Sequence, residues 1–283
     1  MSAPDTRTQA RTLGGSTGLR DRWASHPFVL VDLPEWDVRG VWQDEHACVL
    51  SVAASAPLGE GGVPDGGAHH QRLGLWGMGS PEATANLLAR VAQDGELGEH
   101  VVSAGLPRGT LAVLGDRCRD RRGDLPAILS DPERERSVST WDFFATREAP
   151  AAQPGEEHVE ALTGPSVAAE VRACLDVANP LAETSPEDPL VRWWGWRDPQ
   201  GVLRGVVGAR QAAPGAPWSL GSVATDPAWR GHGIAAATTA VVTRAGLTES
   251  DWVTLGMYAD NDAARRVYTR LGYAVVQEFE SRH

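Results

Sequence analysis

The sequence predicts an α/β fold in which helices cover a mixed β-sheet, with two such domains in tandem. Its 283 residues are enough for two domains of ordinary size. Segments with strand-like and helix-like patterns alternate through the second half of the chain, as in a sheet covered by helices. The stretch REAPAAQPGEE, residues 147–157, is rich in Ala and Pro and has no apolar period, so it divides the chain almost in half.

The second half predicts the order strand, helix, three strands, helix, strand, helix, strand. Apolar residues at helical spacing begin at Ile234 and mark the second helix, and Gly272 ends the third as a C-cap. Asp198 to Gly201 form a turn by composition. The expected strands are 158–163, 190–198, 202–211, 218–225, 252–259 and 273–279, and the expected helices are 166–178, one from 234 to 245, and 262–272.

The first half repeats this pattern more faintly. Ser80 and Pro81 have the residue types of a helix N-cap and first helical position, and a strand precedes them. The strand-to-helix steps at 73–92 and 218–245 suggest a duplication, and 56–71 reads as a long loop. Strands are expected at 47–54, 73–79, 100–106, 110–114 and 138–144. The predicted division is a flexible tail (1–20), a degenerate domain without a cofactor motif (21–148), a linker (149–157) and a cofactor-binding domain (158–283).

Composition and charge exclude several classes of function. The net charge of −11 argues against a nucleic-acid partner and suits a cationic substrate such as an amine. The chain contains no lysine, which excludes a GxxxxGK[ST] phosphate loop. No metal site is expected, because the three cysteines are far apart and the histidines lack ligand spacing. No apolar run approaches a membrane span and the first twenty residues lack a secretory signal, so we expect a cytoplasmic protein without a membrane partner.

The stretch Arg230-Gly231-His232-Gly233-Ile234-Ala235 lies between a predicted strand and a predicted helix. Backbone N–H groups at a helix N-terminus lack intrahelical partners and attract anions. The two glycines carry no Cβ to hold a phosphate away, and Arg230 supplies further donors. The stretch therefore indicates a pyrophosphate site, or alternatively a glycine-rich turn beside a solvated arginine.

The same glycines also satisfy a dinucleotide fingerprint, with Asp251 twenty residues after Gly231. In that fold, however, the acidic residue ends the second strand, whereas Asp251 precedes the strand expected at 252–259. Residues 226–230 also separate the first glycine from its strand. Both points disfavour a nicotinamide cofactor.

Two motifs together resemble the GNAT superfamily of acyl-CoA-dependent N-acetyltransferases. Arg230, Gly233 and Ala235 match its R/Q-x-x-G-x-G/A signature, and Asn261, Tyr268 and the sequence Leu-Gly-Tyr at 271–273 match its later pattern. The resemblance covers residues 158–283 and implies an enzyme that transfers the acetyl group of acetyl-CoA to a primary amine of a small molecule by direct attack. A non-catalytic acyl-CoA-binding or regulatory protein of the same fold is the alternative.

The resemblance also implies roles for particular residues. Tyr268 would protonate the departing thiolate, Asn261 would contact the cofactor arm, and the strand backbone would pair with the pantetheine. The residues implied to bind the cofactor are Val223, Ala224, Thr225, Arg230, Gly231, His232, Gly233, Ile234, Ala235 and Asn261.

Asn261 and Tyr268 lie seven residues apart, which is two helical turns, so both can address the end of one strand. A phenol with a pKa near ~10 is protonated at neutral pH and can donate to a thiolate. The alternatives are that Tyr268 is a packed core residue and that Asn261 is a helix N-cap. The general base stays open among Ser222, His232, a water chain and the more distant Glu183, Glu187 and Glu278. The acceptor's identity and the oligomeric state also stay open.

Overall fold

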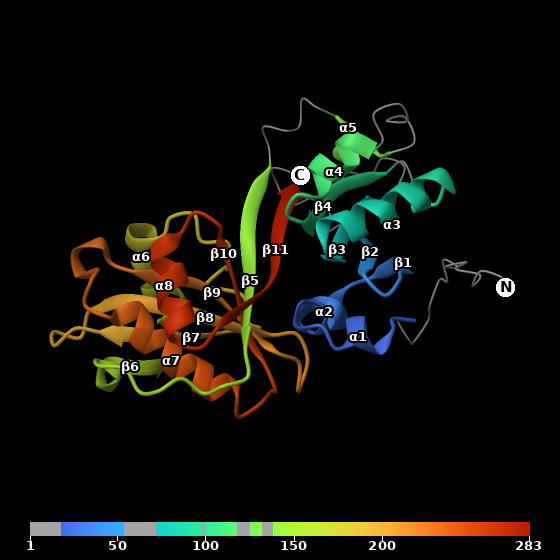
Figure 1. Ribbon diagram of the computed structural model, residues 1–283. Coiled ribbons are helices and arrows are strands. Elements are labelled where there is room, and N and C mark those ends of the chain that lie inside the picture. Colours follow the sequence, from blue (N-terminus) through green and yellow to red (C-terminus); the bar gives the residue numbers. More distant parts are fainter. Residues whose placement is uncertain (1–17, 54–71, 98–99, 118–124, 132–137) are drawn as a thin grey trace. The chain divides into compact units, whose positions relative to one another are not determined.

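A computed structural model describes residues 18–53, 72–97, 100–117, 125–131 and 138–283, and Figure 1 labels its elements. The predicted loop at 56–71 and nearly all of the predicted tail lie outside these residues. The chain forms two compact units: unit 1 comprises residues 1–25, 36–141 and 277–283, and unit 2 comprises 26–35 and 142–276. Neither unit is continuous in the sequence, so the units differ from the linear domain boundaries that we predicted.

Unit 1 contains a sheet in the order β1-β2-β3-β4-β11. Strands β1 to β3 are antiparallel, and β3 and β4 are parallel with α3 between them. As predicted, Ser80 caps α3, where its Oγ accepts a hydrogen bond of 3.2 Å from the N–H of Ala83. The elements are α1 (Asp21–Ala24), β1 (Val38–Gln43), β2 (Ala47–Ala53), β3 (Leu73–Gly79), α3 (Pro81–Gln93), β4 (Val101–Pro107), α4 (Thr110–Arg117), α5 (Ala127–Ser130) and the end of β11 (Ala274–Arg282).

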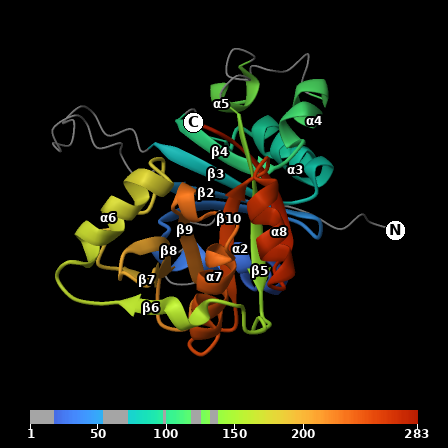
Figure 2. The same cartoon turned by 90° about the vertical axis from the view of Figure 1, so that its left-hand side faces the viewer.

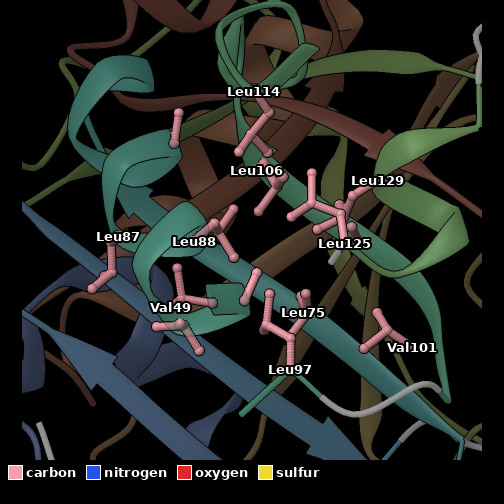
Figure 3. Close-up of a cluster of buried hydrophobic side chains, with 14 of the residues drawn as sticks. Val49, Leu75, Leu87, Leu88, Leu97, Val101, Leu106, Leu114, Leu125 and Leu129 are labelled. Carbon is pink, nitrogen blue, oxygen red and sulfur yellow. The ribbon is translucent and has the colours of Figure 1, made fainter. Parts of the chain in front are cut away.

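The core of unit 1 lies between this sheet and helices α3, α4 and α5. Leucines of α3 and α4 point toward side chains of the strands, as Figure 3 shows. The buried residues labelled there are Val49, Leu75, Leu87, Leu88, Leu97, Val101, Leu106, Leu114, Leu125 and Leu129. This core holds no part of the predicted cofactor site.

The strand predicted at 110–114 is wrong, because these residues begin helix α4. Thr110 and Leu114 are buried whereas Ala112 is exposed, so burial follows a helical spacing of four and not the alternation of a strand. Gly109 has a φ of 97°, which turns the chain sharply after β4. A carboxylate oxygen of Glu280 then accepts the N–H of Leu111 at 2.7 Å, satisfying a donor of the first turn.

Unit 2 contains a sheet in the order β5-β10-β9-β8-β7-β6. Strands β6 to β9 pair antiparallel, and β9 and β10 are parallel with α7 between them. β7, β8, β9, α7 and β10 thus repeat the succession of β1, β2, β3, α3 and β4 in unit 1. The elements are α2 (Pro27–Asp32), β5 (Ser139–Thr146), β6 (Val159–Leu162), α6 (Val167–Ala178), β7 (Val191–Arg197), β8 (Leu203–Gln211), β9 (Trp218–Thr225), α7 (Ile234–Gly246), β10 (Val253–Tyr258), α8 (Asp262–Arg270) and the start of β11.

Helices cover both faces of the sheet in unit 2, and Figure 2 shows α6 and α7 on different sides of the strands. Trp193 packs with α6, whereas Trp194 packs with α7 and α8. Together with Trp196, both are buried, so these tryptophans are core residues. Gly272 follows α8 with a φ of 88°, as expected of a C-cap glycine.

The predicted linker at 149–157 is part of unit 2. Arg244 of α7 donates to the carbonyl of Pro150 at 3.1 Å and pairs with the carboxylate of Glu156 at 2.5 Å. The indole N–H of Trp196 donates to the carbonyl of Gly155 at 2.9 Å. This segment is therefore fixed to the sheet and helix that carry the predicted site.

Candidate functional site

Strand β9 contains a bulge near its end. Residues Val206 and Gly208 of β8 pair with Ala224 and Gly221 of β9, so one residue of β8 faces two of β9. Ser222, within the bulge, has a φ of 50°, the sole positive value among the described residues other than glycine. Its hydroxyl oxygen is buried and makes no hydrogen bond. This strained position is typical of a functional site.

The strands β9 and β10 part just before this bulge. Their parallel register ends at Leu220 and Leu255, although β9 continues to Thr225 and β10 to Tyr258. Beyond Leu220, β9 keeps β8 on one edge, whereas the edge toward β10 has no strand partner in the described register. The hydroxyl of Thr225 is also buried without a hydrogen-bond partner. The backbone of residues 223–225 therefore has no strand partner on the side of β10 in the described register.

The turn after β9 is set by backbone geometry. Asp226 caps a short 3₁₀ helix (Pro227–Trp229) by accepting from the N–H of Ala228 at 2.9 Å. Gly231 and Gly233 then have φ values of 83° and 80°, a region that favours glycine. A Cβ at either position would meet no atom within 4 Å, so open space lies before both.

Helix α7 begins at this turn without a side-chain cap. Gly233 is the N-cap residue and there is no acidic residue in the first turn, so the first N–H groups have no side-chain acceptor. Ile234 is buried, and its side chain packs so close to the backbone of Gly205 that a Cβ there would lie 2.5 Å from it. Ile234 thus anchors the helix start, whereas Ala235 is partly exposed. The helix start has the geometry of an anion site.

The side chains of Arg230 and His232 lie along the turn. The guanidinium of Arg230 donates to the carbonyls of Thr225 at 3.4 Å and of Ala178 at 3.2 Å. These contacts use two of its five N–H donors and hold it beside the end of α6. His232 places Nδ1 3.1 Å from the carbonyls of both Trp229 and Arg230. Both side chains are exposed.

Asn261 is the N-cap of α8, where its Oδ1 accepts the N–H of Ala264 at 3.1 Å. The predicted alternative role is therefore confirmed, and the amide NH₂ of Asn261 is left as a possible donor. Tyr268 is 6% exposed and packs against Phe144 and Tyr273 at ring distances of 6.1 and 6.2 Å. Burial raises the pKa of Tyr268 to about 12, so its phenol keeps its proton at neutral pH.

The three glutamates considered as a general base have different partners in the structure. Glu187 is paired with Arg172, and Glu278 pairs with Arg108 at 3.4 Å within unit 1. Glu183, in contrast, accepts a hydrogen bond of 3.3 Å from the hydroxyl of Tyr258 at the end of β10. Tyr258 is not among the site residues predicted from the sequence, although its place at the end of an apolar strand, three residues before Asn261, is a usable signal.

Comparison with known proteins bears on residues 210–281, which match the family model of the FR47-like proteins. That segment is GNAT-related. It contains β9, the turn, α7, β10 and α8, and so includes every predicted site residue. No curated protein matches the chain.

Several solved structures are similar in fold to this chain. A GCN5-related N-acetyltransferase from Kribbella flavida is 16% identical over 94% of this chain and 96% of its own, with a TM-score of 0.49. A Drosophila protein is 11% identical over 83% and 79%, with a TM-score of 0.50. A tandem GNAT protein from the clavulanic acid biosynthesis pathway is 13% identical over 85% and 84%, with a TM-score of 0.40. The predicted α/β fold, a mixed sheet covered by helices, is confirmed, and the family matched at 210–281 is consistent with acyl transfer.

The structure adds two observations on metals and membranes. The described part of the chain holds no group of three or more His, Cys, Asp or Glu side chains that could bind a metal ion. Within the same residues, none of the helices is long and apolar enough to span a membrane.

Proposed function

We propose that unit 2 binds acetyl-CoA and transfers its acetyl group to a primary amine of a small molecule by direct attack. One observation carries the proposal: β9 parts from β10 at a bulge, and the same strand then leads into an uncapped helix start fronted by open space. A free strand edge suits the amide-bearing pantetheine arm, and a helix N-terminus suits a pyrophosphate.

The residues present fit this cofactor. The backbone of Val223, Ala224 and Thr225 would pair with the arm, since their edge toward β10 lacks a strand. The N–H groups from Gly231 to Ala235 and the unused donors of Arg230 would hold the pyrophosphate. The amide of Asn261 would contact the arm from the start of α8.

The chemistry then needs a proton donor and a place for negative charge. Bound acetyl-CoA would supply an acyl group activated as a thioester. Tyr268 holds its proton at neutral pH, which is the state that a donor to a departing thiolate requires. The bulge leaves an extra residue of β9 outside the ladder with β8. The backbone N–H of that residue would donate a hydrogen bond to the negatively charged oxygen that forms when the amine attacks the thioester.

We expect acetyl-CoA to raise the melting temperature of the protein and NAD⁺ to leave it unchanged, because a ligand that binds only the folded state stabilises it. Differential scanning fluorimetry measures both. The enzyme assay is an amine panel with saturating acetyl-CoA, followed by mass spectrometry of the products. Stabilisation by NAD⁺ alone would overturn the cofactor assignment. Stabilisation by acetyl-CoA with no acetylated amine would favour the non-catalytic alternative.

Replacing Arg230 with alanine should weaken acetyl-CoA binding by about tenfold, the loss of one charge-assisted hydrogen-bonding group. Isothermal titration calorimetry gives the Kd directly. Arg270→Ala is the matched control, since Arg270 is an exposed arginine at the far end of α8 from Asn261. Equal affinities of the Arg230 and Arg270 variants would remove Arg230 from the pyrophosphate site.

A further inference from the structure

The loop between α6 and β7, residues 179–190, spans the place where β9 and β10 part. On one side, a Cβ on Gly221 would lie 2.9 Å from Oγ1 of Thr184, so this part of the loop rests on β9. On the other side, Glu183 accepts the hydroxyl of Tyr258 at the end of β10. Gly221 follows the last residue of β9 that pairs with β10. Adjacent residues of one loop therefore contact both strands at their separation.

The carboxylates of this loop differ in how their charge is balanced. Glu187 is neutralised by Arg172 and also accepts from the hydroxyl of Ser185 at 2.8 Å. Asp188 accepts the backbone N–H of Leu190 at 2.9 Å. Glu183 is exposed and accepts from a neutral phenol, and no ion pair with it occurs within the part of the chain that the structure describes. The carboxylate in turn raises the pKa of Tyr258.

Tyr258 adds an aromatic surface to this charge. Its side chain is 57% exposed, which is unusual for a large ring at the end of a buried strand. The carboxylate of Glu183 lies at the hydroxyl end of this exposed ring, so an ammonium group can be attracted by the charge and by the quadrupole of the ring. The same pair repels a carboxylate. The charge and the ring at the rim of the strand separation thus favour a cation over an anion.

We infer that the acceptor is a diamine or polyamine, whose second ammonium group is held by Glu183 and Tyr258 while its reacting amine attacks at the bulge. This inference rests on the proposed function of the same site. In the transfer, the N–C bond forms as the C–S bond breaks, and the proton lost by the attacking nitrogen balances the one gained by the departing sulfur. The second ammonium group keeps its proton throughout, because it serves only in binding.

Three amines of equal chain length separate this inference from general amine acetylation. They are 1,4-diaminobutane, n-butylamine and 4-aminobutyrate, whose far ends are cationic, neutral and anionic. We expect kcat/KM for the diamine to exceed that for butylamine by about tenfold, after a factor of two for its two equivalent amines, with 4-aminobutyrate lowest. The difference should lie mainly in KM, since the second ammonium group binds and does not react.

Three variants test whether Glu183 causes the preference for the diamine. Glu183→Gln should bring the diamine to the level of butylamine, and Glu183→Arg should make 4-aminobutyrate the best of the three. Glu187→Gln is the matched control in the same loop and should keep the preference of the original protein, because Arg172 already balances that charge. The reversal by arginine is a gain of activity, which a misfolded variant cannot produce.

The outcomes distinguish this inference from the function on which it rests. If acetyl-CoA does not bind in calorimetry, both fail. If acetyl-CoA binds and amines are acetylated without preference for the diamine, or if Glu183→Gln keeps the preference, only the diamine inference is overturned. If Glu187→Gln abolishes the preference as Glu183→Gln does, the loop acts through its structure and Glu183 does not bind the acceptor.

Discussion

Tyr268→Phe is expected to lower kcat by about a hundredfold while leaving the Kd for acetyl-CoA unchanged. A positioned general acid contributes roughly 10²- to 10⁴-fold, and the substitution removes only the donating hydroxyl. Steady-state kinetics with a competent amine and calorimetry with acetyl-CoA give the two quantities. Because the pKa of Tyr268 is raised to about 12, its proton should not cause a loss of kcat between pH 8 and 10.

Tyr273→Phe provides the matched control for this prediction. Tyr273 is also buried beside Tyr268, but its hydroxyl lies 2.6 Å from Oγ1 of Thr243 and has no role in the proposed reaction. Its replacement should lower the free energy of unfolding by about 1 kcal/mol through the lost hydrogen bond, without changing kcat. If both variants keep full activity, Tyr268 has a packing role alone and the thiolate is protonated from elsewhere.

Gly233→Val is expected to weaken acetyl-CoA binding by about a hundredfold. The substitution places a branched side chain on a residue with a φ of 80°, at the N-cap of α7, where open space would receive the pyrophosphate. The strained backbone should cost about 2 kcal/mol of stability in addition. Urea unfolding and calorimetry measure the two effects separately.

Gly215→Val is the matched control for Gly233→Val: it introduces the same backbone strain at a position outside the proposed pyrophosphate site. Gly215 has nearly the same φ, 79°, and equally open space for a Cβ, but it lies in the turn before β9, at the other end of the strand. This variant should lose similar stability and bind acetyl-CoA normally. An equal loss of affinity in both variants would show that destabilisation alone explains the effect of Gly233→Val.

Most elements of unit 2 could be predicted because local patterns and tertiary burial agree there. Helix α8 places Tyr268 in the core and keeps Arg266 and Arg270 exposed, so its apolar period matches its environment. The prediction of a strand at 110–114 was wrong because a five-residue apolar run fits a strand or a helix equally well. Its helical state depends on Gly109 and on the distant carboxylate of Glu280.

The candidate site could be predicted only where one short stretch carries it. The turn from Arg230 to Ala235 is local, and its glycines reveal the left-handed conformations directly. The bulge at Ser222 depends on the register with β8, and serine gives no signal of a positive φ. The contact between Glu183 and Tyr258 joins residues that are 75 apart in the chain, so no spacing rule could suggest it.

The division of the chain into units has a consequence for how the protein can be cut. Strand β5 begins in unit 1 and ends in unit 2, strand β11 does the reverse, and α2 belongs to unit 2 although it precedes the first strand. A fragment starting at residue 158 would lose α2 and β5 from the unit that carries the site, and a fragment ending at 148 would lose the strand that pairs with β4. The two halves of the sequence therefore cannot be separated without breaking a unit: the sheet of unit 1 needs both β1 and β11, and unit 2 needs residues from α2 through the start of β11.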